Sequence, residues 1–172
     1  MARMQALNLT RQGKFALRAG RANVCLCLRR LWYINELIVK TEEFFHKHWN
    51  DEKNYPAWKN RWDWSSSVPY HNKAGVYALF DESGRLLYIG LGASVRSVKY
   101  QEHGVSRRLL SHVIKKDPTK KRTYAPRKKW ASVSGIGAIG FDYSDSYLAA
   151  ALEVFLIRQL KPPMNNVGKI DL

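Results

Sequence analysis

The sequence predicts an α+β fold: a small three-stranded antiparallel sheet flanked by helices, preceded by a helical and basic N-terminal extension. Two apolar runs on either side of a polar turn, over residues 75–90, have the pattern of a β-hairpin. A third apolar run over 130–143 and two stretches with helical periodicity supply the remaining strand and the helices. The 172 residues, 45% of them hydrophobic, are enough for one domain with a real core and an extension.

The predicted hairpin brings two tyrosines to one face of the sheet. If residues 83–84 form a two-residue loop, Tyr77 lies opposite Gly90, and Tyr77 and Tyr88 are diagonal neighbours on the same side. Core packing explains an arbitrary pair of this kind. Here Gly75 and Gly90 leave bare backbone beside each tyrosine, which is expected where a ligand approaches closely.

The charge of the chain points to a polyanionic partner. A net charge of +15 favours nucleic acid first and an anionic membrane surface second. No apolar run approaches the length of about 18 residues that a membrane-spanning helix needs, and no secretory signal follows Met1. Cys25 and Cys27 are too close to bridge each other, so the cytoplasm is the expected location. The Arg-rich start, without an acid until Glu36, leaves an organellar transit peptide as the alternative.

The predicted extension covers residues 1–65. Residues 1–21 form a basic arm, and residues 22–49 have a helical pattern of apolar positions. The simplest interpretation of that pattern is a helix that packs on the domain. A helix lying on a membrane surface is the alternative, although the acids at 36, 42 and 43 weaken it.

Tryptophans at 49, 58, 62 and 64 crowd the end of this extension, with cations among them. Such tryptophans either fix an extension to a core or stack on nucleic-acid bases. Residues 58 and 62 would share one side of the segment if it were helical. Three serines and a proline over 65–69 then indicate a linker, so the second domain is predicted to cover residues 69–172.

A helix and a basic run follow the hairpin. The helix is predicted over 106–116, with Ser106 as its N-cap and Pro118 ending it. Eight cations then lie near a single acid, Asp117, and they are Lys115, Lys116, Lys120, Lys121, Arg122, Arg127, Lys128 and Lys129. A charge run is commonly just a solvated face. No acidic segment offsets this one, so contact with a phosphate backbone is predicted.

The segment from Gly135 to Gly140 has the letters of a dinucleotide-binding fingerprint. That fingerprint opens a helix directly, whereas residues 141–144 intervene here, and too few residues follow to complete a doubly wound sheet. We therefore predict a strand at this position.

The last helix is predicted to start at Ser144 or Asp145 and to end near Leu160, before a Pro-Pro pair. Within its apolar run over 148–157, Glu153 is the only charge. A carboxylate in that position must be paired, neutralised or bound to a metal. A buried ion pair with an arginine is the structural alternative.

Together these parts resemble the GIY-YIG nuclease superfamily over about residues 69–167. The matching positions are Gly75-Val76-Tyr77 and Tyr88-Ile89-Gly90, then Arg108 and His112 in an R-x-x-x-H pattern, and then Glu153, Pro162-Pro163 and Asn165. Val76 replaces the first isoleucine of the motif, and Leu91 stands where many members have a cation. A 17-residue gap separates Gly90 from Arg108 and is longer than in the simplest members. Arg96 is a weaker candidate for the essential arginine, because no histidine follows it at the matching distance.

The resemblance implies a metal-dependent DNA endonuclease. It implies Tyr77 as general base, directly or through a water, with Tyr88 and His112 in its hydrogen-bond and proton network. It also suggests that Asn165 orients Glu153 or a phosphate oxygen.

Phosphodiester chemistry is consistent with these assignments. A lone carboxylate suggests one divalent metal, magnesium, held by Glu153 and waters, and Arg108 can contact the phosphoryl oxygens. An ordinary phenol titrates near 10, so the site must lower the pKa of Tyr77. The alternatives are a catalytically silent nucleic-acid-binding module and a membrane-surface protein.

Overall fold

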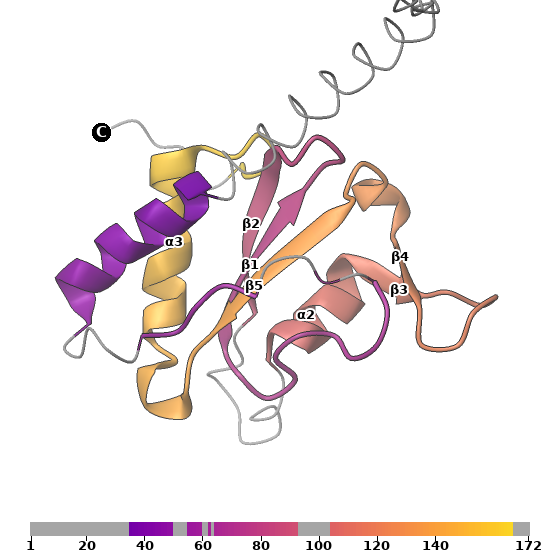
Figure 1. Cartoon of the computed structure of the whole chain (residues 1–172), viewed down its shortest axis with the longest axis horizontal. Coiled ribbons are helices and arrows are strands. Elements are labelled where there is room, and N and C mark those ends of the chain that lie inside the picture. The colour runs from indigo at the N-terminus through magenta and orange to yellow at the C-terminus, as the bar shows by residue number, and fades with distance from the viewer. Residues whose placement is uncertain (1–34, 50–54, 60–61, 63, 93–103, 167–172) are drawn as a thin grey trace, which may run out of the picture.

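The computed structural model describes residues 35–49, 55–59, 62, 64–92 and 104–166 (Figure 1). In this part of the chain the α+β prediction is confirmed: there are three α-helices, a three-stranded antiparallel sheet and a separate two-stranded sheet. No helix among these residues is long and apolar enough to cross a membrane.

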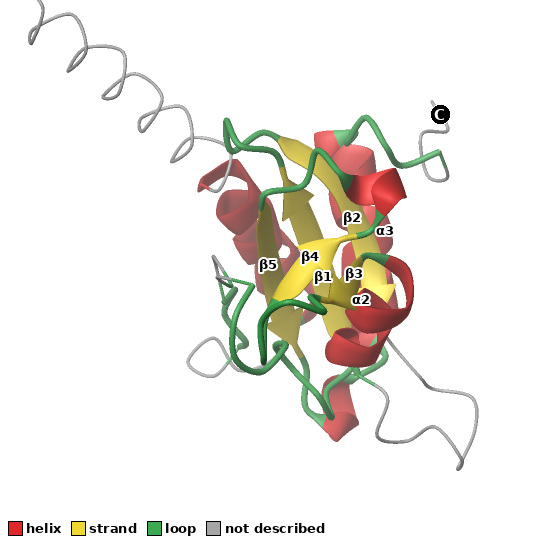
Figure 2. Ribbon diagram, turned by 90° about the vertical axis from the view of Figure 1, so that its right-hand side faces the viewer, coloured by secondary structure: helices red, strands yellow, loops and turns green. Residues whose placement is uncertain are grey.

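The three-stranded sheet lies at the centre. Its strands are β1 (Gly75–Phe80), β2 (Leu86–Gly92) and β5 (Gly135–Gly140), in the order β2-β1-β5, so β2 is an edge strand. The helix over 35–48 and α3 (Leu148–Leu160) share a core with one face, and α2 (Val105–His112) packs on the other (Figure 2). Strand β1 is buried on both faces, which accounts for its apolar sequence.

The hairpin between β1 and β2 has the predicted tyrosine register but a different turn. The Gly84 N–H donates to the Asp81 carbonyl, and Gly84 has a φ of 84°, so three residues form the loop instead of two. One extra residue in β2, Leu87, then shifts the register, and Tyr77 still lies opposite Gly90. The two departures from the prediction cancel. The bulge also places Leu87 and Tyr88 on the same face of the sheet.

Helix α2 is shorter than predicted because its last turn is diverted into a second hairpin. Strand β3 (Ile114–Lys116) pairs with β4 (Tyr124–Pro126), where the sequence predicted continued helix and loop. The helix starts after Gly104, one residue before Ser106, which was expected as the N-cap. Ser106 is 3% exposed, and its N–H donates to the Tyr70 carbonyl.

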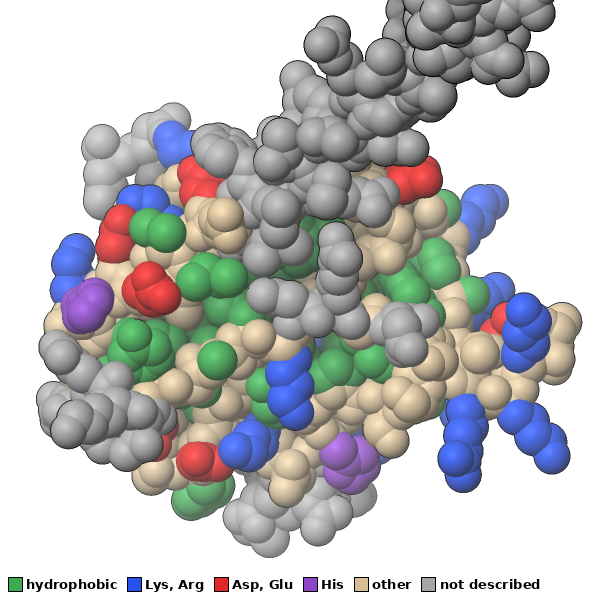
Figure 3. All heavy atoms as spheres, in the orientation of Figure 1, with side chains coloured by type: hydrophobic (Ala, Val, Ile, Leu, Met, Phe, Trp, Pro, Cys, Tyr) green, Lys and Arg blue, Asp and Glu red, His purple; other side chains and the backbone are tan. Residues whose placement is uncertain are grey.

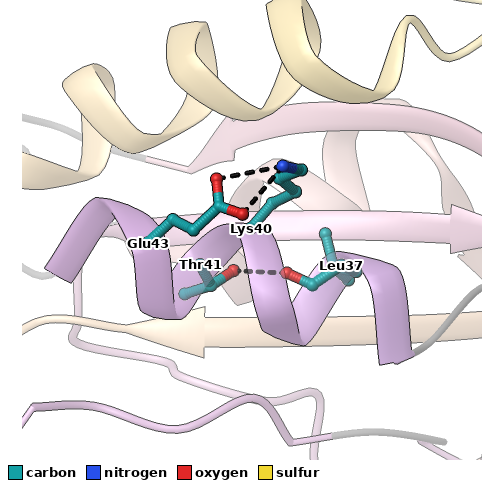
Figure 4. A network of polar contacts seen from close by, with 4 residues as sticks. All are labelled: Leu37, Lys40, Thr41 and Glu43. Carbon is teal, nitrogen blue, oxygen red and sulfur yellow. Dashed lines mark hydrogen bonds and ion pairs between the residues drawn. The ribbon is translucent and has the colours of Figure 1, made fainter. Parts of the chain in front are cut away.

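The helix over 35–48 packs on the domain, as the simpler interpretation predicted. Leu37, Phe44 and Phe45 are buried in the core that α3 also enters. The Thr41 hydroxyl donates to the Leu37 carbonyl, while Lys40 forms a surface ion pair with Glu43 (Figure 4). The predicted basic arm and helical positions before residue 35, with both cysteines, lie outside the described residues.

The tryptophan-rich segment joins the extension to the sheet. Residues 55–59 are extended, not helical, and Lys59 exchanges two backbone hydrogen bonds with Ala138 of β5. Trp58 donates to the Thr41 hydroxyl, which links the segment to the N-terminal helix. Ser65 forms a bridge with Thr123 and Val68 is buried, so the stretch predicted as a linker is bound to the domain. Residues on both sides of the predicted boundary share one core.

The last strand and helix begin later than predicted. A 3-10 helix, η2 (Lys128–Trp130), occupies the predicted start of the strand, and another, η3 (Tyr143–Asp145), precedes α3. The predicted end of α3 at Leu160 is confirmed, and Lys161 follows in the left-handed conformation. Residues 135–140 are a strand, so the rejection of the dinucleotide fingerprint is also confirmed.

Candidate active site

Five of the predicted catalytic residues converge at the β2 edge of the sheet. Their sources are β1 for Tyr77, β2 for Tyr88, α2 for Arg108 and His112, and α3 for Glu153. The two tyrosine rings lie 6.1 Å apart between centroids, and their hydroxyls are hydrogen-bonded to each other. Arg108 donates to the Tyr77 hydroxyl and interacts electrostatically with Glu153.

The two site residues of α2, Arg108 and His112, contact each other because they lie one helical turn apart. Arg108 and His112 lie four residues apart on an exposed face, and Arg108 Nη1 is 2.5 Å from His112 Nε2. Burial, followed by the neighbouring charges of Arg108, Arg127 and Lys129, lowers the pKa of the His112 imidazole. At pH 7 this imidazole is therefore neutral and able to accept a proton.

The carboxylate of Glu153 is half-buried, as its apolar helix predicted. Burial raises the pKa of Glu153, while the Leu91 backbone N–H and the charge of Arg108 oppose the shift. No described cation forms an ion pair with this carboxylate, so the structure does not contain the predicted alternative of a buried Glu–Arg pair.

The outward-facing groups of β2 explain how α3 and the segment after it reach the site. In an edge strand, alternate residues direct their N–H and C=O groups away from the sheet. The Leu87 carbonyl accepts from the Met164 N–H, and Ile89 is bonded to Asn165. Two residues further along β2, the Leu91 N–H donates a hydrogen bond to the Glu153 carboxylate. These hydrogen bonds fix the positions of α3 and of the segment after it relative to β2.

Asn165 has a different contact from the one predicted. Its Oδ1 accepts from the Ile89 N–H at 2.9 Å, and its Nδ2 donates to the Ile89 carbonyl at 2.7 Å. The amide is 5% exposed and reproduces the pairing of a neighbouring strand. Asn165 therefore holds β2 beside Gly90, and it does not orient Glu153.

Both tyrosine hydroxyls are protonated in this environment, and the pKa of Tyr77 is raised, so the prediction that the site lowers it is wrong. Burial is the largest cause of the raised pKa of Tyr77; the neighbouring Tyr88 hydroxyl and the Glu153 carboxylate raise it further, and Arg108 opposes the shift. The pKa of Tyr88 is raised as well, mainly by burial. Tyr77 is 2% exposed, so its ring belongs to the core and only its hydroxyl faces the site.

The bare backbone at Gly90 is filled by the protein itself. A Cβ at Gly90 would lie 2.5 Å from the Tyr77 hydroxyl oxygen and 2.7 Å from Tyr88 Cε1. The Tyr77 ring thus crosses β2 at Gly90 to bring its hydroxyl to the edge. At Gly75 a Cβ would collide with the Ile139 carbonyl. The predicted approach of a ligand to these glycines is replaced by intramolecular contacts.

We expect Gly90→Ala to displace the Tyr77 ring and to abolish any activity of this site. Overpacking of this kind costs about 1–3 kcal/mol of the free energy of unfolding, measured by urea denaturation. Gly135→Ala is the matched control in the same sheet, because its nearest neighbour would be Phe80 Cβ at 3.7 Å, an ordinary contact. Equal stability and activity of the two variants would contradict this account of Gly90.

The eight predicted phosphate-binding cations belong to β3, β4, η2 and the segments that join them. On the side of the molecule where the β3–β4 hairpin lies, basic side chains project into solvent (Figure 3). All eight are exposed. Arg127 differs from the others, because its guanidinium donates to the carbonyls of Leu110 and Ile114 and so ties the end of α2 to β3.

Trp130 is a residue of the site that sequence reasoning missed. Its ring packs edge-on against Tyr88 at 5.0 Å, and its Nε1 donates to the His112 carbonyl. A lone tryptophan after a basic run carries no sequence signal for this contact. Arg96, the weaker arginine candidate, lies outside the described residues.

Comparison with known proteins gives no match: no family model, curated protein or solved structure is significantly similar to this chain.

Proposed function

We propose that this protein is a metal-dependent DNA endonuclease of the GIY-YIG type. The observation that supports this best is the meeting of two phenols, an arginine, a neutral imidazole and a carboxylate at one sheet edge. Acid–base groups beside a cation and a free carboxylate are what phosphodiester hydrolysis requires.

The Glu153 carboxylate is a suitable oxygen ligand for a divalent ion such as magnesium. Among the described residues no group of three or more His, Cys, Asp and Glu side chains gathers. Glu153 is the protein ligand that we propose, and waters and phosphate oxygens would complete the oxygen shell that such an ion prefers. The half-buried carboxylate without an ion-pair partner is suited to a cation. Such an ion would supply charge neutralisation at the phosphate.

The protein side chains have separable tasks in this proposal. Arg108 donates to the phosphoryl oxygens as negative charge builds on them. Because burial keeps both hydroxyls protonated, Tyr77 accepts a proton from the attacking water only while it passes its own proton to Tyr88, and Tyr88 releases its own proton in the same step. His112, neutral and exposed beside Arg108, is the next acceptor toward solvent.

We expect Tyr77→Phe to reduce the cleavage rate by about 10²–10⁴-fold, the usual contribution of a positioned acid or base. The ring stays in the core, so the free energy of unfolding should change by only about 1 kcal/mol. Single-turnover cleavage and urea denaturation measure the two effects. A variant that cleaves at nearly the normal rate would transfer the base role to Tyr88 or His112.

The basic side of the molecule is the proposed contact for the DNA backbone. Lys120, Lys121 and Arg122 lie in the turn of the β3–β4 hairpin, which extends away from the sheet (Figure 1). Each phosphate contact contributes roughly 0.9 to the slope of log affinity against log salt. Neutralising all three residues with glutamine should therefore flatten that slope by about 3.

Fluorescence anisotropy of a labelled duplex over a salt series measures this slope. Arg85→Gln is the control for loss of a cation from a different turn, since Arg85 is exposed in the turn between β1 and β2, and it should leave the slope unchanged. An unchanged slope in the triple variant would remove the hairpin from the proposed footprint.

The proposed activity is tested with supercoiled, linear and branched DNA, each with magnesium and with EDTA. Cleavage by the wild-type protein in magnesium, absent in Glu153→Ala, supports the endonuclease. Tight binding without cleavage of any of the three substrates would favour the silent binding module instead.

A further inference from the structure

A cavity lies at the end of the sheet where β1 starts and β5 ends. It has a volume of about 500 Å³, within the usual range of small-ligand sites. Its wall combines two lysines, two aromatic rings, an amide, an imidazole and a carboxylate. None of these residues belongs to the proposed catalytic cluster.

One cation of this cavity is held in place before any ligand arrives. The backbone of Lys59 pairs with Ala138 through hydrogen bonds of 2.7 and 3.0 Å. Its ammonium lies 4.8 Å from the centre of the Tyr70 ring. That ring is itself fixed, because it packs on Gly140 where a Cβ would lie only 2.5 Å from it. The loss of side-chain freedom on binding an anion is reduced accordingly.

The other polar groups of the cavity offer both donors and acceptors. Lys73 forms an exposed ion pair of 2.6 Å with Asp142. His71 and Asn72 are exposed, and their side chains have no hydrogen bond within the described part of the chain. A bare phosphate would meet the Asp142 carboxylate unfavourably. A nucleotide matches the set better, since its amino or hydroxyl groups can donate to the carboxylate and the amide.

The cavity is directly connected to the helix of the catalytic arginine. The carbonyls of Tyr70, His71 and Lys73 accept from the first N–H groups of the α2 region, at 3.0–3.3 Å. A ligand held by residues 70–73 is therefore on the same rigid support as Arg108. This link makes the cavity a candidate for part of the same substrate.

We propose that this cavity binds one nucleotide of the nucleic-acid substrate, with its phosphate at Lys59 and its base or sugar at Asn72 and Asp142. This inference rests on the proposed function and adds a feature of the substrate. A nucleotide in the cavity has its base out of the stack, so DNA with an unpaired nucleotide is the favoured class.

The test is a titration of the full chain with dAMP, deoxyadenosine and inorganic phosphate in EDTA, followed by amide NMR shifts. We expect dAMP to shift residues 71–73 and Gly140 and to bind more tightly than the other two probes. Lys59→Gln should weaken dAMP binding about tenfold, the value of a charge-assisted hydrogen bond, while Arg85→Gln should not. Wild type should also prefer a duplex with a one-nucleotide bulge over a continuous duplex, and Lys59→Gln should lose this preference.

Three results would overturn the inference: dAMP shifts confined to the β3–β4 hairpin, phosphate binding as tight as dAMP binding, or equal affinity for bulged and continuous duplexes. The readouts require no catalysis. Nucleotide binding at the cavity together with an absence of cleavage would refute the endonuclease and retain the cavity site, so the two failures are distinguishable.

Discussion

Arg108→Ala should lose cleavage by about 10²–10³-fold, the usual effect of removing one transition-state donor, while keeping most of its affinity for DNA. Arg108 is one of 29 Lys and Arg residues, so its removal subtracts little from the total attraction to phosphate. Its particular value lies in its position, bonded to the Tyr77 hydroxyl and to His112 and facing Glu153. Single-turnover rates and anisotropy binding on the same duplex separate the two effects.

Arg107→Ala is the matched control for Arg108. It removes the same charge from the adjacent exposed position of α2, where the side chain points elsewhere on the helix. We expect its cleavage rate to stay within a few-fold of wild type. Cleavage and affinity that fall in proportion in Arg108→Ala would make Arg108 an ordinary phosphate contact. Arg108→Lys should recover little, because an ammonium lacks the fork that can bond a tyrosine and an imidazole together.

Glu153→Gln should abolish cleavage and yet leave the metal-free protein at least as stable as wild type at pH 7. Burial raises the pKa of Glu153 in the folded state above its unfolded value. A raised pKa means that the unfolded state releases this proton more readily. The destabilising contribution is thus absent at low pH and grows as pH rises from the unfolded pKa to the folded one. The gain in the variant is at most about 1 kcal/mol, since the carboxylate is partly exposed and screened.

Urea denaturation in EDTA from pH 4 to pH 7 measures this difference. The glutamine keeps an oxygen for the Leu91 N–H, whereas Glu153→Met removes that acceptor and isolates its contribution. Glu42→Gln, a change at an exposed carboxylate of the N-terminal helix, reports the effect of removing a carboxylate elsewhere. A clear loss of stability at pH 7 in Glu153→Gln would mean that the carboxylate is structural.

Periodicity and lone charges were sufficient to predict most of this architecture. The two-residue loop assumed at residues 83–84 predicted the correct pairing of Tyr77 with Gly90, because the extra residue at Leu87 compensates for the longer loop. The isolated charge of Glu153 on an apolar helix indicated its half-buried position. Pro162 marked the end of α3, which is followed by a left-handed residue.

Other features depend on contacts between residues far apart in the chain, and no local pattern contains them. Strands β3 and β4 are three residues each. Two of the three residues of β3 are lysines and β4 ends in a proline, so their composition resembles a loop. Asn165 reproduces a strand neighbour for Ile89, a residue 76 positions earlier. The Leu91 contact with Glu153 depends on which strand lies at the sheet edge, and this follows from the tertiary order of strands.

In our proposal, Glu153 serves metal-dependent hydrolysis at the β2 edge. Single-turnover cleavage of a labelled duplex, at saturating protein and over a magnesium series that starts in EDTA, tests it most directly. We predict that wild-type cleavage is absent in EDTA, rises with magnesium and saturates, while Glu153→Gln binds the duplex equally well and leaves it intact throughout. Cleavage in EDTA, or the same magnesium dependence in both proteins, would contradict the claim.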